Sequence, residues 1–430
     1  METLRKWTFM VYMAGDNGKF FDDGQQLMAD LQSFGWMNIT DMAKVGSTKD
    51  VAILTQFDTL DQKQYTPRFF IDQSSPYGRL VDKIPPVNTG DPQNLTEFIV
   101  WAERNYPAEK YALVLWNHGT GWKEDDVYAR YREKIDKVHS IGEVRSGYHG
   151  NKLLKNAFFI PTIGEIMSIE DSETRGICYD DSSMSFLDNR GLATALEKAQ
   201  ASTGQRLTII GMDACLMSMI EVACQLQPFA DVMVGSQEVE RAEGWPYQAI
   251  LQKLIMNPDL TADELGKIIV SEFGNYYLCM SRNSGGRNTQ SAINLQTIPE
   301  VMRLIMNLTK TIEESFSNNY KVELSLSRAR SSVQSFYDSD YVDLLHLAML
   351  VKAEYSEENT ELSSEIENLI EYLIPGSDNG LILNNFHGGE RANANGISIY
   401  LPYRFYSPYY DNQAFSISGW NRIIRLMLKI

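Results

Sequence analysis

The sequence predicts an α/β protein in which helices cover both faces of a mainly parallel sheet. In roughly the first 255 residues, short apolar runs alternate with amphipathic helical patterns. Most of these runs stop abruptly at small or polar residues, as buried parallel strands do where they turn toward a helix. After residue 255 the pattern changes, so we expect one domain at 1–255 and a second, mixed domain at 256–430.

Five apolar runs in the first region are the expected strands of the sheet. They lie at 8–14, 51–57, 111–116, 207–211 and 232–235. Helical stripes at 95–102, 192–199 and 216–226 separate several of them. This βαβα order favours right-handed crossovers and therefore parallel neighbouring strands.

The second region combines helices with two late strands. Threonine and glutamate stand three residues apart, as in capping boxes, at Thr261 and Glu264 and at Thr297 and Glu300. Both pairs are expected to open helices. Strands are expected at 381–386 and 397–401. We expect this mixed α/β domain to complete part of the first domain's core.

Residues 122–176 interrupt the regular alternation of the first domain. They show no clean periodicity, and from Lys123 to Lys155 they contain eight basic and six acidic side chains. A connection of this length inside a domain is typically a functional loop. A small inserted subdomain is the alternative interpretation.

The charge and cysteine content restrict the class of protein. The chain has 430 residues, with 56 acidic and 39 basic side chains, for a net charge of −17. A negative field disfavours nucleic acid and is compatible with a basic partner, although it also aids solubility. Four cysteines make no disulfide scaffold. No apolar run is long enough to span a membrane, and we expect a cytoplasmic protein unless an export signal lies outside this chain.

Two predicted strands end in residues that can do chemistry together. The third run ends in Asn117-His118-Gly119, and the fourth ends in Asp213-Ala214-Cys215. The carboxyl ends of parallel strands share one edge of the sheet, where such folds bind their ligands. If the two strands are neighbours, a thiol and an imidazole face one crevice.

This pair suggests nucleophilic catalysis. Cys215 is expected at the start of a helix, where the dipole would favour its thiolate. His118 can act as a general base or acid, and the N–H groups of Gly119 and Cys215 can bind an oxyanion. Cys215 could instead be a small core residue and His118 a loop residue. A zinc site from His118, Cys178 and Cys215 lacks any CxxC or HExxH spacing.

Several segments in order resemble the clostripain family of cysteine peptidases, which has the caspase-like fold. The most specific are YALVLWNHGTGW around His118 and LTIIGMDACLMSMIEVA around Cys215. TFMVYMAGDN near the start, DVMVGSQEVERAEGWPY and the late NGISIYLP also match. The resemblance implies a caspase-like αβα sandwich and a Cys–His dyad that cleaves peptide bonds after Arg or Lys.

The resemblance also implies roles for individual residues. His118 matches the family histidine and Cys215 the nucleophile, while Asp213 matches the acid that lines the specificity pocket. A buried carboxylate there would pair with a guanidinium. A second acid is expected from the loop after the fifth strand, and Glu238, Glu240 and Glu243 are equal candidates.

Two departures from the family pattern leave questions open. The corner Asp16-Asn17-Gly18-Lys19 differs from the family's usual continuation, so no metal is required and calcium binding stays open. The long insert is where the family cuts itself at a basic residue, and nine are available: Lys123, Arg130, Arg132, Lys134, Lys137, Arg145, Lys152, Lys155 and Arg175. The alternative function is a catalytically silent caspase-fold module that binds a basic partner.

Overall fold

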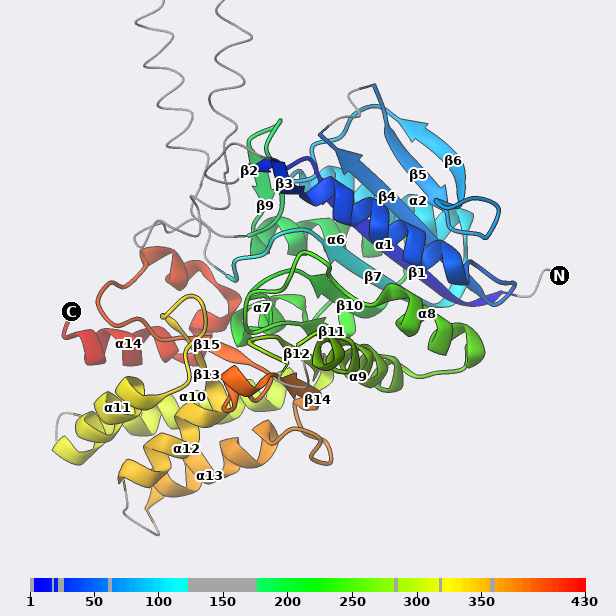
Figure 1. Ribbon diagram of the computed structural model, residues 1–430. Helices are drawn as coiled ribbons and strands as arrows, with labels where there is room; N and C mark the ends of the chain where they lie inside the picture. The colour runs from blue at the N-terminus through cyan, green and yellow to red at the C-terminus, as the bar shows by residue number, and fades with distance from the viewer. Residues whose placement is uncertain are drawn as a thin grey trace, which may run out of the picture.

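The computed structural model describes residues 4–17, 19–21, 27–60, 64–122, 176–281, 285–316, 319–355 and 360–430. The insert at 123–175, with the basic residues proposed for self-cleavage, lies outside these ranges. Within the described part of the chain, the centre is a nine-stranded sheet with the order β14-β12-β11-β10-β7-β1-β4-β5-β6 (Figure 1).

The five expected strands are confirmed, and they lie next to one another as a parallel block. They are β1 (Arg5–Gly15), β4 (Val51–Thr59), β7 (Ala108–Trp116), β10 (Leu207–Asp213) and β11 (Ala230–Gly235). Every residue of β4 is buried, which explains why these segments appear as continuous apolar runs.

Antiparallel strands extend the parallel block on both sides. They are β5 (Thr66–Phe70) and β6 (Arg79–Ile84) at one edge, and β12 (Thr289–Asn294) and β14 (Ile382–His387) at the other. Of these, only β14 was expected from the sequence. Short hairpins form from β2 (Lys19–Phe21) with β3 (Leu27–Asp30) and from β8 (Ile177–Asp180) with β9 (Ser185–Leu187).

Helices cover both faces of the sheet and make an αβα sandwich (Figure 1). On one face lie α1 (Leu31–Val45), α8 (Tyr247–Met256) and α9 (Ala262–Met280), and on the other α2 (Pro92–Asn105), α6 (Asn189–Thr203) and α7 (Ile220–Leu226). Alternate β1 residues supply the two cores, Phe9 and Val11 on one face and Met10 and Tyr12 on the other. The predicted fold class is therefore confirmed.

The C-terminal part adds a helical layer beside the sandwich. Its helices are α10 (Ile298–Phe316), α11 (Tyr320–Ser332), α12 (Leu344–Tyr355), α13 (Glu361–Leu373) and α14 (Trp420–Leu428). It also contains a two-stranded antiparallel sheet of β13 (Tyr341–Asp343) and β15 (Ser398–Tyr400). The central sheet continues into this part through β12 and β14, and one apolar core runs through both. The boundary near residue 255 stays a prediction.

The two expected capping boxes have different outcomes. Thr261 and Glu264 cap α9 reciprocally, as predicted. Thr297 belongs instead to a 3₁₀ turn before α10, and its hydroxyl donates to the Gly380 carbonyl at 3.5 Å. The expected helix is present, but its expected cap is wrong because a tertiary contact takes the hydroxyl.

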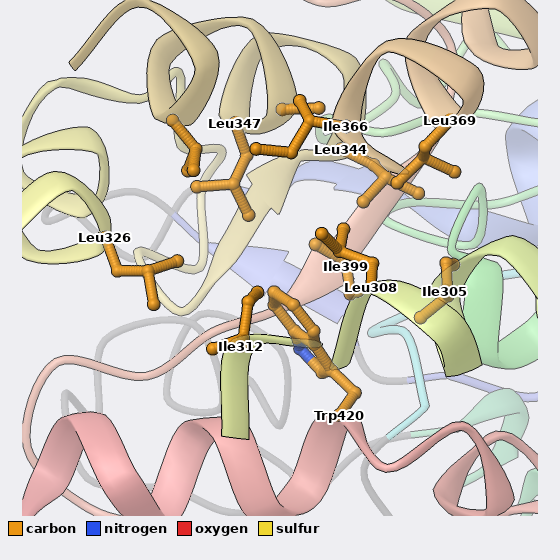
Figure 2. Close-up of a pocket in the computed structure, with 12 residues that line it drawn as sticks. Ile305, Leu308, Ile312, Leu326, Leu344, Leu347, Ile366, Leu369, Ile399 and Trp420 are labelled. Atoms are coloured by element: carbon orange, nitrogen blue, oxygen red, sulfur yellow. The ribbon is translucent and has the colours of Figure 1, made fainter. Parts of the chain in front are cut away.

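An apolar cavity of about 30 Å³ lies inside the helical layer (Figure 2). Its wall comes from α10 to α14 and from β15, and all twelve lining residues are apolar. A void of this kind stays dry, because water would find no polar partner there. Among the described residues, no helix combines the length and apolarity needed to cross a bilayer.

Candidate active site

The two strands that carry the candidate chemistry are neighbours, which meets the condition that the sequence left open. In the parallel register of β7 and β10, Trp116 lies opposite Asp213, and the Asn117 N–H donates to the Asp213 carbonyl at 3.3 Å. His118 and Cys215, each two residues further on, therefore leave the sheet at adjacent points of its carboxyl edge.

Gly119 lies directly against the Cys215 turn. A Cβ atom at Gly119 would come within 2.5 Å of the Cys215 carbonyl oxygen and 2.9 Å of the Ala214 side chain. Only glycine allows this approach. The close packing brings the backbone of the histidine segment onto the backbone of the cysteine segment.

Cys215 does not begin a helix, and the predicted dipole effect on its thiol is wrong. The helix α7 starts only at Ile220, and Leu216 takes a left-handed conformation with φ near 62°. The N–H groups of Leu216 and Ser218 donate instead to carbonyls of the loop after β11. Because the loop uses these groups, the turn continues past Cys215 before a helix can form.

The Cys215 thiol is buried and covered by main chain. Burial raises its pKa to about 11, and hydrogen bonds from the N–H groups of Glu240, Gly119 and Cys215 itself offset part of that rise. Its sulfur accepts from the Glu240 N–H at 3.3 Å and donates to the Glu240 carbonyl at 3.7 Å. The thiol is thus protonated at neutral pH in this conformation.

His118 is neutral at neutral pH. Burial lowers the pKa of its imidazole to about 3, because the charged form loses its hydration. An imidazole with so low a pKa is a weak base, so its surroundings must become more polar before it can take the proton of the Cys215 thiol.

A network of buried amides fixes the turn that carries His118. Asn117 donates to the Ala14 carbonyl at 2.5 Å and to the Asn17 side chain at 2.8 Å, and it accepts from the Tyr179 N–H at 2.8 Å. Asn17 in turn donates to the Tyr179 carbonyl. Sequence reasoning missed this network. The signal was present, since an asparagine follows the end of each neighbouring strand, β1 and β7.

Asp213 lies at the base of the site and is 5% exposed. It accepts from the Trp245 N–H at 3.1 Å and from the Tyr247 hydroxyl at 2.8 Å. Burial raises its pKa to about 6, against these hydrogen bonds. Gly244 lets the loop close on the carboxylate, since a Cβ atom there would lie 2.8 Å from Asp213 Oδ2.

Glu240 is the candidate acid that lies beside Asp213. Burial, and then the charge of Asp213, raise its pKa well above the ordinary value. Both of its carboxyl oxygens are buried, and neither takes part in a hydrogen bond of standard geometry with a described residue. A buried pair of carboxyl groups with raised pKa values is costly to ionise, and a cation between them would relieve that cost.

The other two candidate acids are occupied elsewhere. Glu238 is 1% exposed, and its carboxylate pairs with Arg287 at 3.3 Å and Arg391 at 2.5 Å. Glu243 is half-buried and pairs with Arg241 at 3.1 Å. Of the three acids that the sequence left open, the structure brings Glu240 to Asp213.

The residues that the sequence raised for a zinc site do not gather as ligands. Among the described residues, Asp16, Asp58 and Asp180 are the group whose candidate ligand atoms all lie within 4.8 Å of one another. All three are buried, and Asp58 and Asp180 accept hydrogen bonds from Thr66 and Thr89. Carboxylate oxygens suit a hard cation such as Ca²⁺, so these residues could hold the calcium that the sequence left open.

Comparisons with known proteins point to one family. A model of the clostripain family matches residues 11–137 and 164–422. The clostripain of Hathewaya histolytica is 27% identical over 369 residues, which cover 76% of this chain and 60% of that protein. The chain therefore spans less than two thirds of the length of this relative.

Solved structures agree on the fold. A secreted C11 cysteine protease of Bacteroides thetaiotaomicron, "iotapain", has a TM-score of 0.63 at 16% identity, over 97% of this chain and 99% of that one. An inactive zymogen C11 protease of Parabacteroides distasonis has a TM-score of 0.61 at 18% identity, over 97% and 98%. The predicted caspase-like fold is thereby confirmed. Because the family model matches far more than half of its residues, the chain belongs to the clostripain family.

Proposed function

We propose that this protein is a cysteine endopeptidase that cleaves peptide bonds after Arg or Lys. The observation that carries the proposal is the buried pair of Asp213 and Glu240 next to the Cys215 turn. Two acids that share this site match the charge of a guanidinium or an ammonium group. A neutral substrate side chain would leave the negative charge of the pair uncompensated, so basic residues are selected.

In the proposed reaction, His118 takes the proton of the Cys215 thiol, and the sulfur attacks the carbonyl carbon of the basic residue itself, so the amine of the next residue is the leaving group. The N–H groups of Gly119 and Cys215 stabilise the oxyanion, an effect typically of about 3 kcal/mol per donor. His118 then protonates the leaving amine. Water hydrolyses the thioester, with His118 again accepting the proton.

The covered thiol means that substrate binding must displace the Glu240 main chain from Cys215. This proposal includes a self-cut at a basic residue within 123–175, which would precede full activity. The same covering also favours the second candidate function, a silent module that binds a basic partner, because a thiol with a raised pKa is a poor nucleophile.

The test uses peptides that carry Arg, Lys or Ala before a fluorogenic leaving group. We expect release after Arg and Lys and none after Ala. Cys215→Ala and His118→Ala should lose release entirely while they keep the wild-type melting temperature. Mass spectrometry of stored protein should show two fragments that meet after a basic residue in 123–175, and none for Cys215→Ala.

Equal inactivity on all three peptides, in stored and fresh protein alike, would contradict the peptidase. Binding of a Lys- or Arg-rich peptide without cleavage would then favour the silent module. Release that persists in Cys215→Ala would point to another nucleophile.

A further inference from the structure

The loop after β11 pairs with the turn that carries the nucleophile. Three contacts link them: Ser218 N–H to Ser236 O at 2.8 Å, Leu216 N–H to Glu238 O at 3.2 Å, and Glu240 N–H to Cys215 Sγ at 3.3 Å. The first two contacts step by two residues along each segment, in opposite directions, which is the spacing of extended antiparallel pairing. The hydrogen bonds from the loop therefore hold the backbone of the cysteine turn in its conformation.

Leu216, directly after the nucleophile, holds the strained position of that turn. Its φ of 62° is a left-handed conformation, which a residue with a side chain adopts only at an energetic cost. Such strain persists only where surrounding contacts impose it. The contact made by the Leu216 backbone N–H is the one with the Glu238 carbonyl.

Glu238 is anchored at every polar atom. Its N–H donates to the hydroxyls of Ser236 and Thr289. Its carboxylate receives four donors, namely the N–H groups of Val239 and Tyr337 and the guanidinium groups of Arg287 and Arg391. Apart from Val239, these donors come from segments far apart in the sequence, the turn before β12, the turn after α11 and the 3₁₀ turn Gly389–Arg391. The carboxylate is thus a junction between the loop and the C-terminal part.

We propose that Glu238, held by Arg287 and Arg391, is a positioning residue for Cys215. It holds the loop in the register that keeps Leu216 left-handed, and it thereby sets where the Cys215 sulfur and N–H point. Its carboxylate is buried and saturated by protein donors, so it does not contact the basic side chain of a substrate. The inference rests on the proposed function for its kinetic test, but the position of Cys215 can be measured without turnover.

The loop should move when this cluster is changed, because its contacts depend on the charge of Glu238 and of the two arginines. Removing an arginine leaves the buried Glu238 carboxylate short of a partner, and Glu238→Gln replaces its charge-assisted hydrogen bonds with weaker neutral ones, so either change loosens the loop. The strained Leu216 would then relax, and the loop would move off the thiol. Peptide hydrolysis should fall while the thiol becomes easier to reach, a combination that loss of substrate affinity would not produce.

The main variant is Glu238→Gln, and two rates are measured. We expect kcat on the Arg peptide to fall at least tenfold, with KM and the preference for Arg over Ala unchanged within about twofold. Labelling of Cys215 by iodoacetamide, followed by mass spectrometry and normalised to the exposed Cys279, should become at least threefold faster. Arg391→Lys keeps the charge but loses the Nε contact, and it should show the same pattern more weakly.

The matched control is Glu313→Gln on α10, where a carboxylate pairs with Arg422 through two guanidinium nitrogens. It removes the same charge from a paired carboxylate and should leave both rates unchanged. If Glu238→Gln does not fold, kcat and the labelling rate of Cys215 are measured instead in Arg391→Lys and in Arg287→Ala, each of which removes one contact of the Glu238 carboxylate.

Two results would overturn the inference. One is a raised KM and a lost Arg preference with kcat unchanged, which would assign Glu238 to the substrate. The other is no change in either kcat or labelling rate. A wild-type protein that labels at Cys215 but cleaves no peptide would refute the proposed peptidase, while faster labelling in Glu238→Gln would still support the positioning role.

Discussion

The carboxyl edge of β7 and β10 and the helical layer of α10 to α14 are both buried, but different forces hold them. The edge contains Asp213, Glu238 and Glu240 among backbone donors, and burial raises the pKa of two of these acids. The helical layer surrounds a cavity that only apolar side chains line. Changes at the edge should therefore alter chemistry and pH dependence, and changes in the layer should alter stability alone.

The largest expected change in activity belongs to Asp213→Asn at the edge. The amide keeps the shape but removes the charge that would pair with a basic side chain, and a charge-assisted hydrogen bond contributes about 1.5–3 kcal/mol. We expect kcat/KM on the Arg peptide to fall by roughly 10- to 150-fold. Competition between Arg and Ala peptides measures the preference, and a loss that is equal for both peptides would contradict a role in specificity.

The next effect belongs to Leu369→Ala in the helical layer, where the side chain lines the cavity (Figure 2). Removing it enlarges an existing void, so the free energy of unfolding should drop by about 3–5 kcal/mol. Denaturant titration measures the drop. The comparison between the two regions fails if kcat per folded molecule also changes or if the drop depends on pH.

A smaller effect is expected at Glu221, which joins the two regions. This buried acid on α7 accepts from the Tyr400 N–H at 2.9 Å and the Tyr410 hydroxyl at 2.7 Å, and burial raises its pKa to about 7. The folded state then holds a proton between pH 4.5 and 7 that the unfolded state releases, so the wild-type stability falls as pH rises through that window.

Glu221→Gln removes this titration. Relative to the wild type, the variant should gain on the order of 3 kcal/mol more stability at pH 8 than at pH 4. Unfolding curves at both pH values test this, with Glu313→Gln as the control on a partly exposed acid. An identical difference at both pH values would show that Glu221 does not titrate in this window.

The smallest effect is expected from Ala348→Val, which adds two methyl groups beside the cavity. Burial of a methylene contributes about 0.8 kcal/mol, and β-branching in a helix costs part of that gain. A net stabilisation of about 0.5–1 kcal/mol should appear in unfolding curves, with peptide hydrolysis unchanged. A loss of stability instead would mean that the void cannot accept the added volume.

Much of the fold and part of the site were predictable because they follow from local pattern. The five parallel strands are continuous apolar runs, and His118 and Cys215 follow directly after two of them. The antiparallel strands β5, β6 and β12 were missed. β6 is largely exposed, whereas β5 and β12 are mostly buried. All three mix polar with apolar residues, so none stands out as a continuous apolar run.

The site's environment was not predictable in the same way. Helical spacing at 216–226 suggested that Cys215 begins a helix, whereas the loop after β11 takes the backbone donors of that turn. The three glutamates of this loop are also equivalent as sequence. Glu238 becomes an anchor only because Arg391 approaches from a segment 153 residues away.

The sequence by itself determined the parallel sheet, the positions of Cys215 and His118 at its carboxyl edge, and the family. The sheet follows from the periodicity of apolar residues, and the site from the residue types that stand at strand ends. The family follows from the resemblance of the segments around His118 and Cys215. Only the tertiary structure decided which acid joins Asp213, where the helix after Cys215 begins, and what covers the thiol. Those outcomes depend on contacts between distant segments, and such contacts set burial and charge at atoms that no local pattern describes.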